Sequence, residues 1–169
     1  MKPTLYYTQT SSPIGGMTLV ATDAGLCGLY LEGQRHWPRN ADTWVRDDEG
    51  ARFDAVLMAL ARYFMGKDIR FSLPLDLVTG TSFQQKVWQA LQEIPAGQTW
   101  TYGQLARHVD APAAVRAVGA AVGRNPLSII IPCHRVIGQD GSLTGYAGGL
   151  DRKRWLLAHE GAELAISAP

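Results

Sequence analysis

Short apolar runs separated by turn residues fill the first part of the chain. Residues 5–10, 17–21 and 26–31 are rich in side chains that favour β-structure. The sequences Pro13-Ile14-Gly15-Gly16 and Asp23-Ala24-Gly25 stand between these runs and are typical of tight turns. The pattern predicts an antiparallel meander of three strands.

The apolar spacing becomes helical after a polar stretch, residues 33–50, which we expect to be a surface connection. A helix ending near Gly66 is predicted by its apolar stripe, which is Phe53, Val56, Leu57, Leu60 and Phe64. An extended piece follows over residues 71–75, and residues 74–81 are the best linker candidate. We therefore expect a small α+β domain over residues 1–79. It holds no convergent set of catalytic residue types, so its expected role is structural.

Residues 80–169 are expected to form a second, mostly helical domain. Ser82 predicts the start of a helix, with Gln85 as its capping-box partner. The sequence Pro95-Ala96-Gly97 ends this helix. Its apolar stripe is Phe83, Val87, Leu91 and Ile94.

Two further short helices are predicted across a tight turn. Thr101 caps the first of them, with Gln104 in the capping-box position. Asp110-Ala111 forms the turn, and Pro112 suits the first position of the next helix. Such a pair is a helix-turn-helix. Many globular proteins contain one, so the pair alone leaves nucleic-acid binding open.

The second helix of this pair, residues 113–123, has one long polar side chain, Arg116, among Ala, Val and Gly. Reading bases in the major groove requires several polar side chains, so a sequence-specific repressor is disfavoured. Two interpretations remain. The helix is buried, with one snorkelling arginine, or it lies in a minor groove. In the second case Arg116 enters the base stack where a nucleotide has been turned out.

Candidate chemistry is concentrated after three isoleucines, residues 129–131, which predict a short buried strand ending at Pro132. Cys133, His134 and Arg135 follow, before the chain becomes apolar again. Either Cys133 is a buried, inert thiol beside a satisfied histidine, or it is a nucleophile with its base. Side chains of neighbours diverge in a strand, so a direct contact requires a turn or a bridging water.

Two later features point to this segment. The last helix begins near Asp151 and ends before Gly161, a plausible C-cap. Glu160 stands at that helix end, where the helix dipole disfavours a carboxylate, and an imidazole would serve as its partner. A glycine-rich loop around Tyr146 suits close approach to a flat ligand, although an ordinary surface loop fits equally well.

Composition adds limits to these interpretations. A chain of 169 residues with 46% hydrophobic and 18% charged residues fits one large or two small globular domains. Its net charge is +1, but residues 100–155 carry seven Lys or Arg against three Asp, which allows polyanion binding. Two cysteines are too few for a disulfide framework, and Cys27 reads as inert packing. We expect a cytoplasmic protein with no membrane span, metal or cofactor.

The segment Pro132-Cys133-His134-Arg135-Val136 resembles the active-site segment of the O6-alkylguanine-DNA alkyltransferases. Supporting matches run in order through residues 82–161. They are Thr101-Tyr102-Gly103-Gln104, Ala114-Val115-Arg116-Ala117-Val118-Gly119, Asn125-Pro126, Gly145-Tyr146-Ala147-Gly148-Gly149, and Trp155 to Gly161. The resemblance implies a ribonuclease-H-like first domain and a winged helix-turn-helix-like second domain.

The resemblance also implies direct-reversal DNA repair on duplex DNA, bound through the minor groove with the damaged nucleotide flipped out. Cys133 would accept the alkyl group from O6-alkylguanine, with O4-alkylthymine as a further candidate substrate. His134 would act as base through a water, and Glu160 would orient it. Each protein molecule would repair one lesion. It would be a monomer in solution, with cooperative binding on DNA as an open option.

The family pattern assigns DNA contacts to Arg116 as the finger that replaces the flipped base, and to the residues around it. These neighbours are Ala114, Val115, Gly119 and Tyr102. Tyr102 would also donate toward guanine N3, and Asn125 would brace the turn before the active-site segment.

The substrate pocket would be shaped by Tyr146, Val122 and Val136, with backbone carbonyls of Cys133 and Val136 accepting from the exocyclic amine. The backbone N–H of Ala147 would face O6. Some members have Ser at this position, so any hydroxyl contribution is lost in this chain.

Three alternatives belong to other classes. A non-catalytic alkylguanine-recognising protein would lack the reactive cysteine, whereas Cys133 is present. A transcription regulator fused to such a domain would need an extra activator domain. A cysteine hydrolase would need an oxyanion hole and an acyl pocket, to which nothing in the sequence points.

Overall fold

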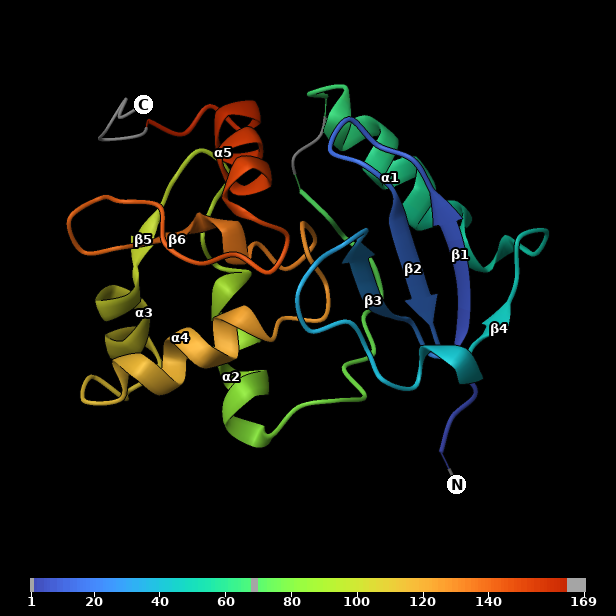
Figure 1. Ribbon diagram of the computed structural model, residues 1–169, viewed down its shortest axis with the longest axis horizontal. Helices are drawn as coiled ribbons and strands as arrows, with labels where there is room; N and C mark the ends of the chain where they lie inside the picture. Colours follow the sequence, from blue (N-terminus) through green and yellow to red (C-terminus); the bar gives the residue numbers. More distant parts are fainter. Residues whose placement is uncertain (1, 68–69, 164–169) are drawn as a thin grey trace.

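The computed structural model describes residues 2–67 and 70–163. A four-stranded sheet with helix α1 lies on one side of the molecule, and helices α2 to α5 lie on the other (Figure 1). One continuous hydrophobic core includes residues from both halves. The α+β class and the two-part layout are as predicted. The boundary between residues 79 and 80 stays a prediction, and it falls just before the N-cap of α2.

The predicted meander is present. Strands β1 (Tyr6–Thr10), β2 (Met17–Ala21) and β3 (Leu26–Leu31) pair antiparallel in sequence order. The sheet has a fourth strand, β4 (Val45–Arg46), which pairs parallel to β1. It lies within the stretch expected to be only a surface connection. Both its residues are exposed, so no apolar pattern marks it in the sequence.

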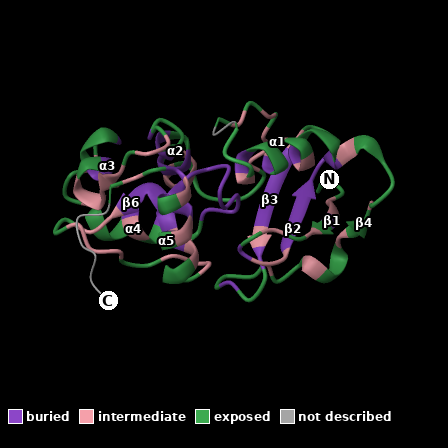
Figure 2. Cartoon of the chain, turned by 90° about the horizontal axis from the view of Figure 1, so that it is seen from above, coloured by how far each residue is buried: buried purple, intermediate pink, exposed green. Residues whose placement is uncertain are grey.

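Helix α1 (Asp54–Phe64) follows two short 3-10 helices, η1 (Ala41–Thr43) and η2 (Ala51–Phe53). Val56, Leu60 and Tyr63 are the buried residues of α1. Figure 2 shows β2 and β3 as the buried strands of the sheet, with α1 beside them. The predicted helical stripe therefore covers the inner face of the meander.

The edge of β3 joins the two halves. Leu26 N donates to Pro74 O at 2.9 Å, and Asp76 N donates to Leu26 O at 2.8 Å. The candidate linker is thus fixed to the sheet at its start. Further along the same strand, Leu29 N donates to Pro126 O at 2.8 Å. The segment that leads to the isoleucines is therefore also held by β3.

Helix α2 (Ser82–Leu91) begins at Ser82, as predicted, but its capping box lies one residue earlier than predicted. Thr81 is the N-cap, and Thr81 and Gln84 form the capping box. The choice of Ser82 and Gln85 was wrong because the sequence offers both registers. Gln85 instead donates to the carbonyl oxygens of Leu77 and Thr79, at 3.3 and 3.2 Å, and ties the preceding segment to the helix.

Helices α3 (Tyr102–His108) and α4 (Val115–Gly123) form the helix-turn-helix pair. Thr101 and Gln104 form the predicted capping box of α3. Helix α4 starts three residues after Pro112, so the predicted start was wrong. Ala114 N donates to Ala111 O at 2.9 Å, which closes a turn over the proline before the helix begins. A short parallel pair, β5 (Trp100–Thr101) and β6 (Val136–Ile137), completes this half.

The isoleucine run is buried, but it is not a strand. Residues 128–130 form a turn, and Ile131 N donates to Leu127 O at 2.9 Å. Ile129 has a φ of +73°, a strained conformation for a β-branched residue. The turn is stabilised by the Asn125 side chain, which bonds backbone groups at both of its ends. The chain then enters a 3-10 helix, η3 (Cys133–Arg135).

Helix α5 (Leu150–His159) ends as predicted. Glu160 is its C-cap residue, and Gly161 follows with a φ of +79°. Among residues 2–67 and 70–163, no helix is both long and apolar enough to cross a membrane.

Candidate active site

Cys133 lies at a small pocket of about 110 Å³ and is itself buried, with 5% of its surface exposed. Three parts of the chain meet there. The helix-turn-helix contributes Tyr102, Gly119, Val122 and Gly123, the glycine-rich loop contributes Gly145, Tyr146 and Ala147, and the first half contributes Arg35 and His36. Larger cavities of about 490 to 560 Å³ lie elsewhere. The chemistry of the lining residues, rather than volume, identifies this pocket as the candidate site.

The thiol of Cys133 is protonated at rest. Burial raises its pKa, while a hydrogen bond from Asn125 and the positive charge of Lys153 partly oppose that rise. A protonated thiol is a poor nucleophile, so the site needs a base. The turn of η3 places His134 next in the chain, and no hydrogen bond joins the two side chains directly.

His134 and Glu160 form the predicted pair. His134 Nε2 lies 2.8 Å from Glu160 Oε2, and both side chains are fully buried. Burial lowers the pKa of His134, so the imidazole is neutral at rest and donates its Nε2–H to the carboxylate. Nδ1 is then the acceptor nitrogen. It is buried and has no hydrogen-bond partner within the described part of the chain.

Glu160 is a carboxylate at neutral pH. Burial alone would raise its pKa, but hydrogen bonds from His134 and Arg135 outweigh burial and lower the pKa to about 2. Cys133, His134 and Glu160 thus provide a thiol, a neutral base whose Nδ1 can accept a proton, and an ionised group that orients the base. We call these three residues the relay. Such a set can remove the proton of a buried thiol.

Helix α4 offers an exposed, small-residue surface next to this pocket. Val115, Arg116, Ala117 and Ala120 are exposed, while Val118 and Ala121 face the core. The interpretation of α4 as a fully buried helix was therefore wrong. Gly119 lies at the pocket and faces the ring of Tyr102, so the exposed surface and the pocket adjoin along one helix.

Two family models match the chain. One, described as the DNA-binding domain of 6-O-methylguanine DNA methyltransferase, matches residues 82–162. The other, described as the ribonuclease-like domain of the same protein, matches residues 5–77. The chain belongs to the 6-O-methylguanine DNA methyltransferase family.

Similar proteins support the same assignment. A methylated-DNA–protein-cysteine methyltransferase of Haemophilus influenzae is 46% identical over 92% of this chain and 86% of its own length. One of Methanosarcina barkeri is 48% identical over 92% of this chain and 97% of its own. The crystal structure of Mycobacterium tuberculosis OGT in complex with DNA has a TM-score of 0.85 and 46% identity, with 92% of each chain covered.

The remaining expected family positions lie around Cys133. The Tyr102 hydroxyl donates to Thr144 O at 3.1 Å. Asn125 Nδ2 donates to Ile131 O at 2.8 Å, and its Oδ1 accepts from Leu127 N at 3.0 Å. Val122, Tyr146 and Ala147 line the pocket. Val136 is buried in β6 and is not a lining residue, and its carbonyl accepts from Lys153 Nζ at 2.6 Å.

Lys153 is a member of the site that sequence reasoning missed. It is fully buried, and its Nζ also donates to the carbonyls of Thr144 and Gly145 at 2.9 and 3.2 Å. Burial lowers its pKa to about 8. The ammonium therefore joins β6 to the glycine-rich loop and places a positive charge near Cys133. A lysine inside the apolar stripe of α5 was the available signal.

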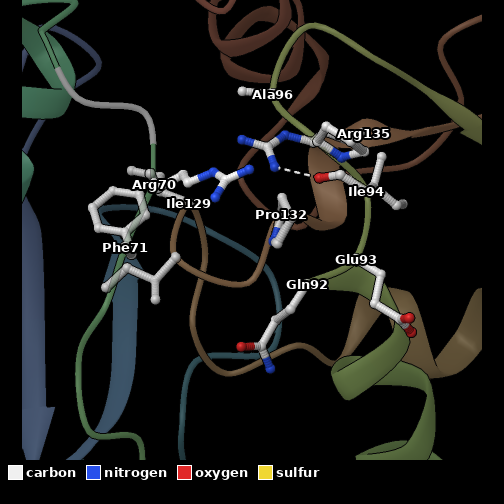
Figure 3. A pocket seen from close by; sticks show the side chains of 11 residues that line it. Arg70, Phe71, Gln92, Glu93, Ile94, Ala96, Ile129, Pro132 and Arg135 are labelled. Atoms are coloured by element: carbon white, nitrogen blue, oxygen red, sulfur yellow. Dashed lines mark hydrogen bonds between the residues drawn. The ribbon is translucent and has the colours of Figure 1, made fainter.

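Arg135 was also missed, although it stands beside Cys133 and His134 in the sequence. Its Nε donates to Glu160 Oε1 at 2.7 Å and its Nη2 to Oε2 at 3.0 Å. Figure 3 shows its guanidinium reaching the carbonyl of Ile94, at 2.6 Å, in the wall of a second pocket. Arg135 thus fixes the carboxylate of the relay and separates it from that pocket.

Tyr63 contributes a contact from the first half of the chain. Its hydroxyl donates to Glu160 Oε2 at 2.6 Å. The expectation that residues 1–79 hold only a structural role overlooked this contact, because nothing near Tyr63 in the sequence marks it. Within the described residues, no group of three His, Cys, Asp or Glu is arranged to hold a metal ion.

Proposed function

We propose that this chain repairs duplex DNA by moving the alkyl group of O6-alkylguanine to Cys133. Family membership supports the reaction class, direct reversal by transfer to a cysteine. The observation that carries the residue assignment is the buried thiol beside a neutral imidazole whose Nδ1 has no hydrogen-bond partner among residues 2–67 and 70–163. That nitrogen is the group that can accept the thiol proton, through a bridging water.

The reaction balances without a cofactor. Cys133 gives its proton to His134, and the thiolate attacks the alkyl carbon. The bond from that carbon to guanine O6 breaks as the carbon–sulfur bond forms, and the electron pair leaves on the guanine. Tyr102 donates a hydrogen bond toward N3 of the departing base. The guanine takes up one proton, which balances the proton that Cys133 gave to His134, so the net products are the thioether and neutral guanine. The thioether offers no facile route back to a thiol, so each molecule acts once.

The DNA is bound through the minor groove by helix α4. Its exposed Val115, Ala117 and Ala120 allow close approach, and Ala114 and Gly119 add no bulk. Arg116 fills the space of the flipped nucleotide. The helix lacks the side chains needed to read a base sequence, which suits a protein that finds lesions in any context. A monomer with one such helix suffices for this binding.

The flipped base enters between Tyr146 and the helix-turn-helix. Val122 limits the width of the pocket, and the backbone N–H of Ala147 faces O6. The carbonyl of Cys133 accepts from the exocyclic amine, whereas the Val136 carbonyl is already bound by Lys153. Ala147 provides no hydroxyl, so recognition of O6 at this position depends on the backbone donor.

Intact-protein mass spectrometry after mixing with duplex DNA containing O6-methylguanine tests this proposal. We expect the wild-type mass to rise by one methyl group per molecule and the DNA to regain guanine. Cys133→Ser is the control and should gain nothing, whereas Cys27→Ser should react like the wild type. Binding without methyl transfer would instead support a non-catalytic recognition protein, and equal methylation of Cys133→Ser would remove the assigned acceptor.

A further inference from the structure

The carboxylate of Glu160 is shared between two parts of the chain. Oε1 accepts from Arg135 Nε, while Oε2 accepts from three donors. These donors are His134 Nε2 at 2.8 Å, Arg135 Nη2 at 3.0 Å and the Tyr63 hydroxyl at 2.6 Å. Tyr63 is fully buried and belongs to α1, 97 residues away in the sequence. The shortest of the three contacts to Oε2 therefore comes from the first half.

A second contact, between Tyr63 and the end of α5, positions the Tyr63 hydroxyl. The carbonyl oxygen of Tyr63 lies 2.6 Å from His159 Nε2, at the end of α5. Because a carbonyl only accepts, His159 must carry its proton on Nε2. The rings of Tyr63 and His159 also pack edge to face, with centroids 5.1 Å apart. The end of α1 and the end of α5 are thus fixed together beside the relay.

Tyr63 is protonated at neutral pH and is therefore a hydrogen-bond donor to Glu160 there. Burial raises the pKa of its phenol, and the adjacent Glu160 charge raises it further. Each donor to a carboxylate draws on the same negative charge. The Tyr63 hydroxyl therefore competes with His134 for Oε2 and weakens the support that Glu160 gives to an imidazolium.

We propose that Tyr63 is a positioning residue of the alkyl-transfer relay, through which the first half of the chain restrains the basicity of His134. The proposal rests on the function proposed above. Other charged or titratable groups also face the relay, namely Arg135 on η3, Lys153 on α5, and Cys133 and Tyr146 at the pocket. Arg35, His36 and Tyr102 also line the Cys133 pocket, but of the donors to Glu160 named above only Tyr63 comes from the first half.

Removing the hydroxyl has a specific consequence for the pH dependence. In Tyr63→Phe, Glu160 supports the imidazolium more strongly, so the proton moves more readily from Cys133 to His134. The population of thiolate–imidazolium pairs then rises at neutral pH. At acid pH, where His134 is already protonated, that population depends only on the thiol and stays unchanged. In a plot of alkylation rate against pH, the rate on the plateau and the pH at which the rate is half of the plateau should therefore rise together.

The experiment measures the second-order rate of alkylation by free O6-benzylguanine as a function of pH, using the full chain. For Tyr63→Phe we expect a plateau about three- to tenfold higher and a midpoint about half a unit to one unit higher. Tyr7→Phe, which removes a phenol from β1 far from the relay, should match the wild type. In a Glu160→Gln background, the Tyr63→Phe substitution should have no effect on the profile.

The competing explanation is that Tyr63 only holds the two halves together. A structural role predicts a lower rate at every pH with an unmoved midpoint, and that result would overturn the proposal. An unchanged profile would overturn it too. Thermal unfolding of each variant shows whether the fold is intact, and the phenylalanine ring preserves the packing against His159. If duplex DNA containing O6-methylguanine does not methylate Cys133 of the wild type, the proposed function itself fails, which is a separate outcome.

Discussion

Arg135 bonds both carboxylate oxygens of Glu160, with Nε 2.7 Å from Oε1 and Nη2 3.0 Å from Oε2. The Glu160 side chain is fully buried, and the Arg135 side chain is 7% exposed. The planar guanidinium matches the carboxylate in two places, which a lysine cannot do. This pair fixes the end of α5 against η3, and so it fixes the geometry of the relay.

Breaking that pair should be strongly destabilising. Arg135→Leu leaves the Glu160 charge buried without its bidentate partner, and we expect a loss of about 3–5 kcal/mol in the free energy of unfolding. Arg135→Lys should retain part of the stability because a charge remains, but it loses the second hydrogen bond. Urea unfolding at neutral pH measures both variants. A loss below about 1 kcal/mol for Arg135→Leu would contradict this role.

The acid stability of the protein should depend on Glu160. Its pKa is held at about 2, below the ordinary value of 4.5, so the unfolded state binds more protons between these values. The Glu160 charge contributes at most about 3 kcal/mol to the free energy of unfolding. This contribution is fully present above pH 4.5 and is lost as the pH falls toward 2.

Urea unfolding of wild type and Glu160→Gln between pH 7 and pH 3 measures this contribution. The difference in unfolding free energy between the two should shrink as the pH falls, because below about pH 4.5 the Glu160 carboxylate takes up a proton in the unfolded wild type and not in the folded protein. A difference that stays constant over that range would show that the Glu160 charge is not linked to folding.

The sequence predicted features that depend on local pattern. The meander follows from short apolar runs between glycine-rich turns, and α3 follows from the capping pair at Thr101 and Gln104. The pairing of Glu160 with an imidazole was also predicted, because a carboxylate at a helix C-terminus needs a partner. In each case the residues that decide the structure are close in sequence or chemically conspicuous.

The sequence did not predict features that depend on contacts between distant residues. Three isoleucines favour a strand, but the Asn125 side chain bonds the backbone at both ends of a turn there and overrides that preference. Tyr63 looks like one more apolar residue of an amphipathic helix, and only the packing of α1 against α5 brings its hydroxyl to Glu160. Lys153 lies in the apolar stripe of α5, but its three carbonyl partners come from other segments and are not marked in the sequence.

The buried ammonium of Lys153 should matter for both stability and reactivity. Lys153→Met keeps the length of the side chain but leaves three carbonyl acceptors without their donor, at a cost of about 2–4 kcal/mol. It also removes a positive charge that lowers the pKa of Cys133. We expect slower alkylation by free O6-benzylguanine, by roughly tenfold.

The two effects of Lys153→Met are separable. Urea unfolding reports the lost hydrogen bonds, and the alkylation rate at high pH reports the reactivity once Cys133 is ionised. The rate deficit should narrow as the pH rises, because ionisation then no longer depends on the nearby charge. A deficit that is equal at all pH values would assign the loss to pocket distortion instead.

Arg116 should act on duplex DNA and not on the chemistry. Its side chain is exposed on α4, and it is absent from the residues that line the Cys133 pocket. Arg116→Ala should therefore slow methyl transfer from duplex O6-methylguanine by at least about tenfold, since the flipped state loses the group that fills the stack. Its reaction with free O6-benzylguanine should remain within about twofold of wild type.

Arg154→Ala is the matched control for this prediction, because it removes the same charge from an exposed position on α5. If Arg116 serves only to attract phosphates, both variants should lose repair to a similar extent, and added salt should reduce the difference from wild type. If Arg116 replaces the flipped nucleotide, its variant alone should be slow, and the deficit should persist at high salt. Single-turnover rates on duplex and free-base substrates, at two salt concentrations, distinguish these outcomes.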